Sequence, residues 1–291
     1  MNEIMPRGLD HIVHAVRDLD AAAALYRSLG FTVGARNKHP WGTHNYLVQF
    51  PGFFIELLTL VQPEKLGDDG FSQLFGRYTG DFLKSQEGLA LMILESKDAE
   101  ADEADFRAAG IAASETMRFE REGWRPDGAP VKVGFSLAFA EDKAAPAIHF
   151  AVCQQHYPEN FWNPAFQHHA NTATGIAGAV LVANEPDRHR GFLEHFTGAE
   201  ASKAEGGFAL AIPRGAIDMT TPAAFLARFG VKPPDTRSGA RLAAMRFAVA
   251  DADRLQDLPE LAGIAGLYQG NAAVIGAEDA MGAVMVFEPS R

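Results

Sequence analysis

A carboxylate stands inside an apolar run, where it needs a chemical partner. Glu56 lies in Phe53-Phe-Ile-Glu-Leu-Leu58, whose alternation predicts a strand with Phe54 and Glu56 on the same, inward face. Burying a carboxylate without a partner is costly, so Glu56 requires a metal ion or a cation such as Arg36 or Arg118. The run therefore marks a candidate functional site.

Histidines also occur in apolar segments. His11 lies in the first β-rich run, and His149 lies in Ala147-Ile-His-Phe150. A single histidine in an apolar strand is more often a hydrogen-bonded core residue than a metal ligand, so each one needs independent support. His39 precedes Pro40 in a predicted loop, where we expect it to be solvated.

The composition and the absence of several motifs exclude some classes of function. The 291 residues carry 37 Asp plus Glu against 26 Lys plus Arg, a formal net charge of −11, which argues against binding of a phosphate backbone. The single cysteine, Cys153, excludes an internal disulfide and a Cys-rich metal site. Nucleotide-binding Gly-rich loops, Gly-x-Ser-x-Gly and His-Glu-x-x-His are absent. Lacking signal-peptide features and any apolar stretch of about 18 residues, the chain is expected to be cytoplasmic and to bind a small molecule, not nucleic acid or membrane.

A repeated strand–helix–glycine unit determines the architecture. A β-rich run is followed by Asp18, a predicted helix and Gly30, and Asp98 and Gly110 repeat this spacing. Asp at a helix N-terminus and Gly after the last turn are ordinary capping preferences. Two further copies end their helices near Gly198 and near Gly263. Because short β-rich segments follow each glycine, three of them in each of the first two copies, the chain is predicted to contain four βαβββ modules.

The modules group into two halves. They cover residues 8–60, 88–153, 175–221 and 240–288. The expected division is a first domain with the candidate site, a linker and a second domain, over residues 1–155, 156–174 and 175–291. Tyr157, Phe161 and Trp162 in the linker either close over a pocket or pack between the halves.

The modules carry a family resemblance. With Leu9-Asp-His11 in the first strand and Ile55-Glu-Leu-Leu58 in the fourth, they resemble the vicinal oxygen chelate family of glyoxalases, bleomycin-resistance proteins and extradiol dioxygenases. Gly30-Phe-Thr-Val33 and the segment from His39 to Asn45 look most like its uncharacterised glyoxalase-like branch. The resemblance implies an α+β fold in which paired βαβββ modules form cup-shaped half-barrels. It therefore implies two glyoxalase-like cup domains here, with a divalent metal inside a cup.

The resemblance also implies a ligand set. The family's ligand positions in the first and last strands of a module carry His11 and Glu56 in the first module. In the second module Leu91 aligns with His11, and His149 aligns with Glu56. Two imidazoles and one carboxylate favour Fe or Mn, with Zn or Ni as alternatives. The second half offers only Asp218 and is expected to be a degenerate scaffold.

The implied function is that of a metal-dependent enzyme of small molecules. It would be a lyase, an isomerase or a ring-cleaving dioxygenase acting on a substrate with adjacent oxygens. Besides Glu56, either His44 or Asn45 could contact substrate oxygen, since strand alternation lets only one of them face the cup. The alternatives are a metal-free protein that sequesters a ligand, as in bleomycin resistance, and a vestigial cup that scaffolds a partner. The resemblance also allows a homodimer.

Overall fold

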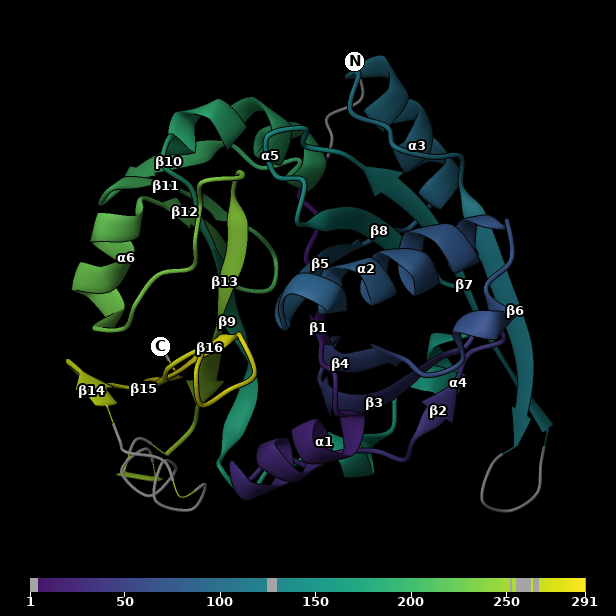
Figure 1. Ribbon diagram of the computed structural model, residues 1–291, viewed down its shortest axis with the longest axis horizontal. Coiled ribbons are helices and arrows are strands. Elements are labelled where there is room, and N and C mark those ends of the chain that lie inside the picture. The colour runs from purple at the N-terminus through teal and green to yellow at the C-terminus, as the bar shows by residue number, and fades with distance from the viewer. Residues whose placement is uncertain (1–4, 125–129, 252, 255–262, 264–266, 291) are drawn as a thin grey trace.

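Two eight-stranded sheets make up the fold, each curved around a concave face (Figure 1). The structure is a computed structural model that describes residues 5–124, 130–251, 253–254, 263 and 267–290. Helices are few and short beside the strands, and the predicted α+β class with two cup-shaped glyoxalase-like domains is confirmed.

The first sheet contains the strands of the first two modules. They are β1 (Leu9–Ala15), β2 (Asn37–Lys38), β3 (Thr43–Phe50), β4 (Phe53–Leu60), β5 (Gly88–Glu95), β6 (Met117–Trp124), β7 (Pro130–Ala140) and β8 (His149–Gln155). Their order is β2-β3-β4-β1-β5-β8-β7-β6. β1 and β5 pair antiparallel at the centre, while β1 pairs parallel with β4 and β5 with β8. The two modules are thus arranged symmetrically about the sheet centre.

The second sheet repeats this arrangement. Its strands are β9 (Ala173–Val182), β10 (Ala201–Ala204), β11 (Gly207–Ala211), β12 (Ala216–Thr220), β13 (Arg241–Val249), β14 (Leu267–Gln269), β15 (Ala272–Ile275) and β16 (Val284–Pro289). The order β10-β11-β12-β9-β13-β16-β15-β14 again places the first strands of two modules at the centre. Between the sheets, the segment 156–172 contains α4 (Pro158–Phe161) and the 3₁₀ turn η3 (Pro164–Phe166).

The capping residues act as their spacing predicts. Asp18 accepts hydrogen bonds from two backbone N–H groups at the start of α1 (Leu19–Ser28), and Asp98 does the same once for α3 (Ala99–Ala108). Gly30 and Gly110 follow these helices with φ of 80° and 72°. In the third module the 3₁₀ turn η4 (Pro186–His189) leads into α5 (Arg190–Thr197), which ends at a left-handed Gly198. The helix predicted before Gly263 lies outside the described residues.

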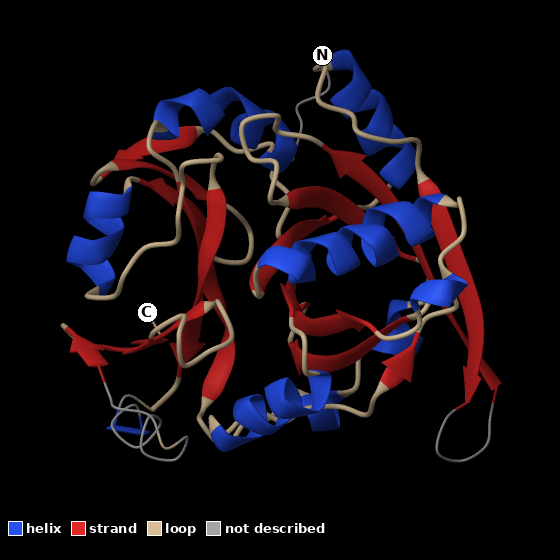
Figure 2. Cartoon of the chain, viewed as in Figure 1, coloured by secondary structure: helices blue, strands red, loops and turns tan. Residues whose placement is uncertain are grey.

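Helical segments that the repeat does not predict occupy both concave faces (Figure 2). The 3₁₀ turn η1 (Pro63–Lys65), the π-helix η2 (Ser72–Arg77) and α2 (Tyr78–Ser85) lie between the first two modules, and Phe75 and Phe82 pack inside the first cup. In the second cup, α6 (Pro222–Phe229) inserts Phe225 and Phe229. Among the described helices, none has the length and apolar character to cross a membrane.

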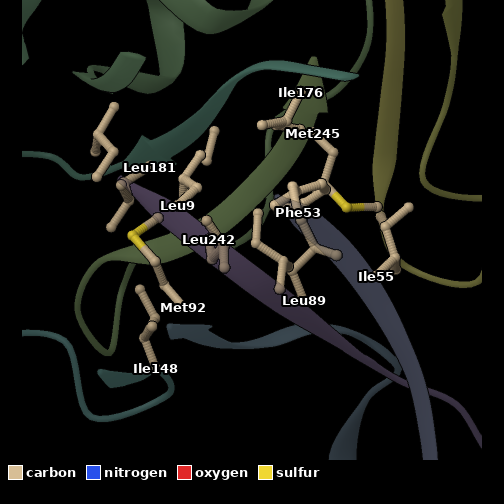
Figure 3. Packing of buried hydrophobic residues seen from close by; sticks show 14 of the residues in the cluster. Leu9, Phe53, Ile55, Leu89, Met92, Ile148, Ile176, Leu181, Leu242 and Met245 are labelled. Atoms are coloured by element: carbon tan, nitrogen blue, oxygen red, sulfur yellow. The ribbon is translucent and has the colours of Figure 1, made fainter. Parts of the chain in front are cut away.

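The convex faces of the two sheets pack against each other through one hydrophobic core (Figure 3). Leu9, Leu89 and Met92 of the first sheet meet Leu242 and Met245 of the second. Because the residues of this shared core are buried, the halves are held together by burial of apolar surface. The concave faces are left to carry any ligand site.

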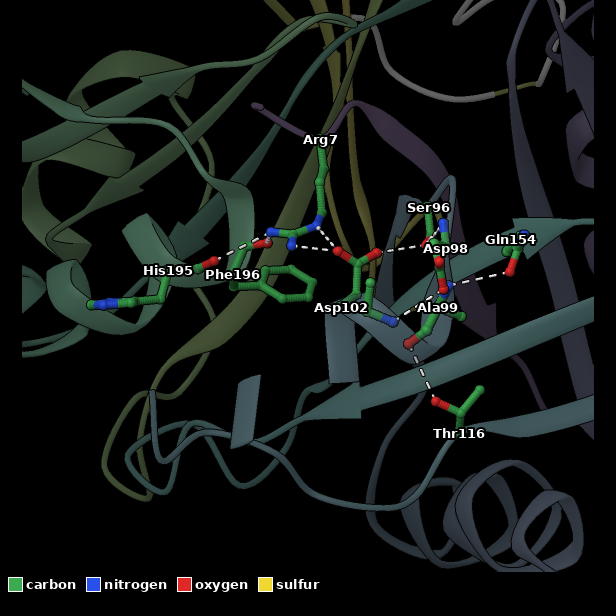
Figure 4. A network of polar contacts seen from close by, with 10 residues as sticks. Arg7, Ser96, Asp98, Ala99, Asp102, Thr116, Gln154, His195 and Phe196 are labelled. Atoms are coloured by element: carbon green, nitrogen blue, oxygen red, sulfur yellow. Dashed lines mark hydrogen bonds and ion pairs between the residues drawn. The ribbon is translucent and has the colours of Figure 1, made fainter. Parts of the chain in front are cut away.

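A buried arginine joins the halves at one end of this interface (Figure 4). The Arg7 guanidinium donates to the Asp102 carboxylate of α3 from Nε at 3.0 Å and Nη2 at 2.5 Å. Its Nη1 donates to the carbonyls of His195 and Phe196 in the last turn of α5. A cation at a helix C-terminus is favourable, so Arg7 stabilises α5 while it pairs with α3.

His14 makes a second polar contact between the halves. Its Nε2 lies 2.9 Å from the Met281 carbonyl of the second half, so Nε2 carries the proton and Nδ1 accepts from the Tyr26 hydroxyl at 2.9 Å. Burial, against the raising effects of the Met281 carbonyl and Glu87, lowers the pKa of His14 to about 4.

We expect this histidine to make the protein less stable as the solution is acidified. Its folded pKa is below its unfolded pKa of about 6.5, so the unfolded chain takes up the proton first, and stability is lost as pH falls from about 6.5 toward 4. The loss attributable to His14 is about 2 kcal/mol at pH 5. Urea unfolding at pH 7 and pH 5 should show a smaller pH dependence in His14→Gln than in wild type. The exposed His168, changed to Gln, should leave that dependence as it is.

Candidate functional site

A cavity of about 100 Å³ lies inside the first cup. Most of its wall is aromatic, from Trp41, Phe54, Phe71, Phe75, Phe119, Phe135 and Phe161. The polar and charged lining residues are His11, Asn37, His39, Asn45, Glu56 and Arg121. Two residues predicted as metal ligands, His11 and Glu56, thus reach the same cavity. Of the linker aromatics, Phe161 closes over it and contacts the Phe54 ring at 5.0 Å.

Glu56 is held at the wall of this cavity by an amide. It is 5% exposed, and its Oε1 accepts a hydrogen bond of 2.5 Å from Asn45 Nδ2. Asn37 in turn donates to Asn45 Oδ1 at 3.1 Å, which fixes the orientation of the amide. No described residue donates to Oε2, so this oxygen is left for a ligand. The predicted cation partners are wrong, because Arg36 pairs with Asp20 and Arg118 with Glu120.

His11 is oriented by a carboxylate that the sequence analysis missed. Its Nδ1 lies 2.6 Å from Asp10 Oδ1, so Nδ1 carries the proton and Nε2 is the basic nitrogen. Gln155 donates to the other Asp10 oxygen at 2.9 Å. Neighbouring residues of a regular strand face opposite sides, but a bulge between Leu9 and His11 redirects Asp10. The ring of His11 stacks on Phe54, with centroids 4.2 Å apart.

His39 is mostly shielded from solvent, with 16% of its side chain exposed, contrary to the expected solvation. Its ring stacks on Trp41 at 4.7 Å, and Nδ1 lies 2.8 Å from the Thr43 hydroxyl. Nε2 is 3.9 Å from Glu56 Oε1. Burial lowers the pKa of His39 and outweighs the opposing effect of Glu56, so the imidazole is neutral at pH 7. A short loop that folds back on β3 explains the burial, since His39 N donates to the Thr43 carbonyl.

Strand alternation separates the two candidates on β3. Asn45 lines the cavity, whereas His44 is on the opposite face and accepts a hydrogen bond from Arg36 Nε at 3.2 Å. The position of His44 does not support the catalytic role predicted for it. Asn45 acts on Glu56 and is in reach of a ligand.

His149 is apart from the cavity. Its ring stacks on Tyr78 of α2 with centroids 3.4 Å apart, and its Nδ1 lies 3.2 Å from the Leu74 carbonyl. Burial lowers its pKa to about 4. The parallel pairs His11–Phe54 and Leu91–His149 show that His149 corresponds to Phe54. The alignment with Glu56 was therefore displaced by two residues.

The second module carries apolar residues at the positions of three polar residues of the first. By the same register, Leu91, Leu137 and Ala151 occupy the positions of His11, Asn45 and Glu56. Cys153 also lines this side, and burial, followed by the charges of Asp10 and Glu56, raises the pKa of its thiol. The thiol therefore stays protonated at neutral pH.

The donor set does not fit the three-ligand metal site implied by the resemblance. His11 and Glu56 share the cavity, His149 is elsewhere, and Ala151 stands where a further ligand would be needed. Throughout the part of the chain that the structure describes, no group of three or more His, Cys, Asp or Glu is arranged to hold a metal ion. Catalytic metal sites ordinarily have three protein ligands. The prediction of Fe, Mn, Zn or Ni thus lacks its third donor.

In the second cup the corresponding carboxylate is neutralised. Asp218 occupies the position equivalent to Glu56, as its pairing with Val180 shows. It accepts hydrogen bonds from Arg246 Nη1 at 2.9 Å and Arg228 Nη1 at 2.8 Å. Arg246 also pairs with Glu288 at 2.7 Å. Both arginines donate to Asp218 Oδ2, so two guanidinium groups compensate the charge of this carboxylate, whereas Glu56 pairs with no arginine or lysine that the structure describes.

Comparison with known proteins identifies the family. The family model described as a glyoxalase-like domain matches residues 9–197, more than half of the chain. The chain belongs to the glyoxalase-like family. The resemblance to vicinal oxygen chelate proteins is thereby confirmed. A search of curated proteins finds no match to this glyoxalase-like chain.

Solved structures share the fold of the glyoxalase-like chain over nearly its whole length. A hypothetical protein from Staphylococcus aureus matches with a TM-score of 0.66 and 13% identity, covering 97% of this chain and 99% of that one. A variant of 4-hydroxymandelate synthase from Streptomyces coelicolor matches with a TM-score of 0.61 and 11% identity, covering 99% and 94%. At these identities the likeness shows a common fold.

Proposed function

We propose that the chain is a small-molecule enzyme whose active site is the cavity of the first cup, and that Glu56 exchanges a proton with the substrate. The observation that carries this proposal is the Glu56 carboxylate, which is buried among aromatic rings with Oε1 fixed by Asn45 and Oε2 unengaged. A positioned carboxylate of this kind is suited to general acid–base catalysis. The reaction class is then that of a lyase or an isomerase.

The neighbouring groups support proton transfer. The Asn45 amide donates to Oε1 of Glu56 and not to Oε2, so it restricts the carboxylate to one orientation while Oε2 takes up or returns the proton. His11 presents a basic Nε2 because Asp10 holds its Nδ1 proton, which provides a second group for proton transfer at the same cavity. The aromatic wall lowers the local dielectric constant around these groups and so strengthens both interactions.

The test is hydrogen exchange in D₂O, since it needs no knowledge of the full reaction. The purified protein, without a chelating tag, is incubated with a panel of small carbonyl compounds that carry adjacent oxygens, such as 2-oxo acids and 2-hydroxy ketones. Loss of the C–H signal is followed by proton NMR, and bound metal is measured by elemental analysis of the same sample. We expect exchange by protein that has been dialysed against a chelator and is free of metal.

Other results separate the alternatives. Exchange that requires reloading with iron, manganese, zinc or nickel, and that is lost with the metal in His11→Ala, would contradict metal-independent catalysis and support the metalloenzyme that the resemblance implies. Binding of panel compounds without exchange would replace the enzyme with a ligand-binding protein.

A further inference from the structure

Arg121 is an exposed residue of β6 that lines the cavity of the first cup. Along β6, Met117 and Phe119 pack against the inner hydrophobic cluster. Alternation places Arg121 on this same face, and it lines the cavity beside its cross-strand partner Val133.

On the outward face of the same strand, the basic side chains form ion pairs with a glutamate. Arg118 pairs with Glu120 at 3.2 Å, and Lys132 of β7 pairs with Glu120 at 3.0 Å. Arg121, by contrast, makes no hydrogen bond or ion pair with any residue that the structure describes, in a chain whose net charge is −11. Its charge does reach the cavity interior, because it contributes to lowering the pKa of His39. The guanidinium is thus available to an anion in the cavity.

The other residues that line the cavity indicate the shape of the uncharged part of the ligand. The aromatic rings that line the cavity favour a flat apolar molecule, which they can contact by stacking or edge to face. The volume of about 100 Å³ leaves no room for more than one ring.

We propose that the first cup binds a small aromatic carboxylate, whose anionic group pairs with Arg121 while its ring lies among the aromatic side chains. Arginine presents a planar fork of donors that matches a carboxylate in two-point contact. Only the claim that this ligand is a substrate rests on the proposed function; binding itself does not depend on turnover.

The test is binding of benzoate, with benzamide as a neutral molecule of nearly the same shape, measured by calorimetry on the full-length protein. We expect benzoate to bind wild type more tightly than benzamide. Arg121→Gln should weaken benzoate binding by about tenfold or more and leave benzamide binding unchanged. Arg121→Lys should retain part of the preference for benzoate. Arg118→Gln, on the outward face of the same strand, is the matched control and should bind as wild type does.

A second variant locates the ligand. Val133→Trp fills the cavity beside Arg121 and should abolish binding of both compounds, with an unchanged thermal midpoint as the check on folding. Equal binding of benzoate and benzamide to wild type, or benzoate binding that is insensitive to Arg121→Gln, would overturn the proposal. Neither result bears on proton exchange by Glu56, so failure here is distinguishable from failure of the proposed function.

Discussion

Glutamine in place of Glu56 is expected to slow proton exchange by about 100-fold or more, because an amide has the shape of the carboxylate but no basic oxygen that can accept a proton at neutral pH. Asn45 can still donate to the amide oxygen, so the geometry of the cavity is retained. The measurement is the initial rate of deuterium incorporation for the panel compound that wild type exchanges fastest.

Two controls distinguish a loss of proton transfer from a loss of stability. Glu64→Gln is the same change at an exposed glutamate of η1 and should keep the wild-type rate. The thermal midpoint of Glu56→Gln should equal or exceed that of wild type, because the cost of burying a charge is removed. A variant with lower stability and an unchanged rate would assign Glu56 a structural role and contradict the proposal.

Replacing Arg246 with methionine is expected to cost about 3 kcal/mol of unfolding free energy. Arg246 is 6% exposed and donates to both Asp218 and Glu288, so its removal leaves two carboxylates without their main buried partner. Methionine keeps most of the apolar contact of the side-chain stem, which isolates the loss of charge pairing. Urea unfolding at pH 7 measures the change.

The matched control for this variant is Arg237→Met. Arg237 pairs with Asp235 on the surface, where its side chain is 89% exposed, and its loss should have little effect on stability. At temperatures where Arg246→Met remains folded, exchange activity should be that of wild type, because the pair lies in the second cup. Loss of activity in the folded variant would show that the second half does more than support the first.

Local signals in the sequence were sufficient to predict the strand–helix modules. Asp18, Gly30, Asp98 and Gly110 specify helix ends through contacts within a few residues, and the structure shows them in those roles. Glu56 was likewise recognisable because an acidic residue within an apolar strand carries a strong energetic demand. These features depend on nearest neighbours along the chain and can therefore be recognised from a single sequence.

Features set by distant parts of the chain were not predictable in this way. The bulge that redirects Asp10 depends on how β1 pairs with β5, and the two-residue displacement of His149 depends on the register between β5 and β8. The shielding of His39 from solvent was not predictable either. It depends on stacking on Trp41, whose indole is in turn covered by Phe71 of the segment before η2. No element had been predicted in that segment.

The first cavity has His11, Asn45 and Glu56 on one module and apolar residues at the equivalent positions of the other, and this difference has a stereochemical consequence. A flat molecule between them presents one of its two faces to Glu56 and His11 and the other to Leu137 and the neighbouring rings. A trigonal carbon would then be protonated from one face only. From a prochiral methylene group, only one of the two hydrogens would be removed. The handedness of such a reaction would follow from which of the two modules carries the polar side chains.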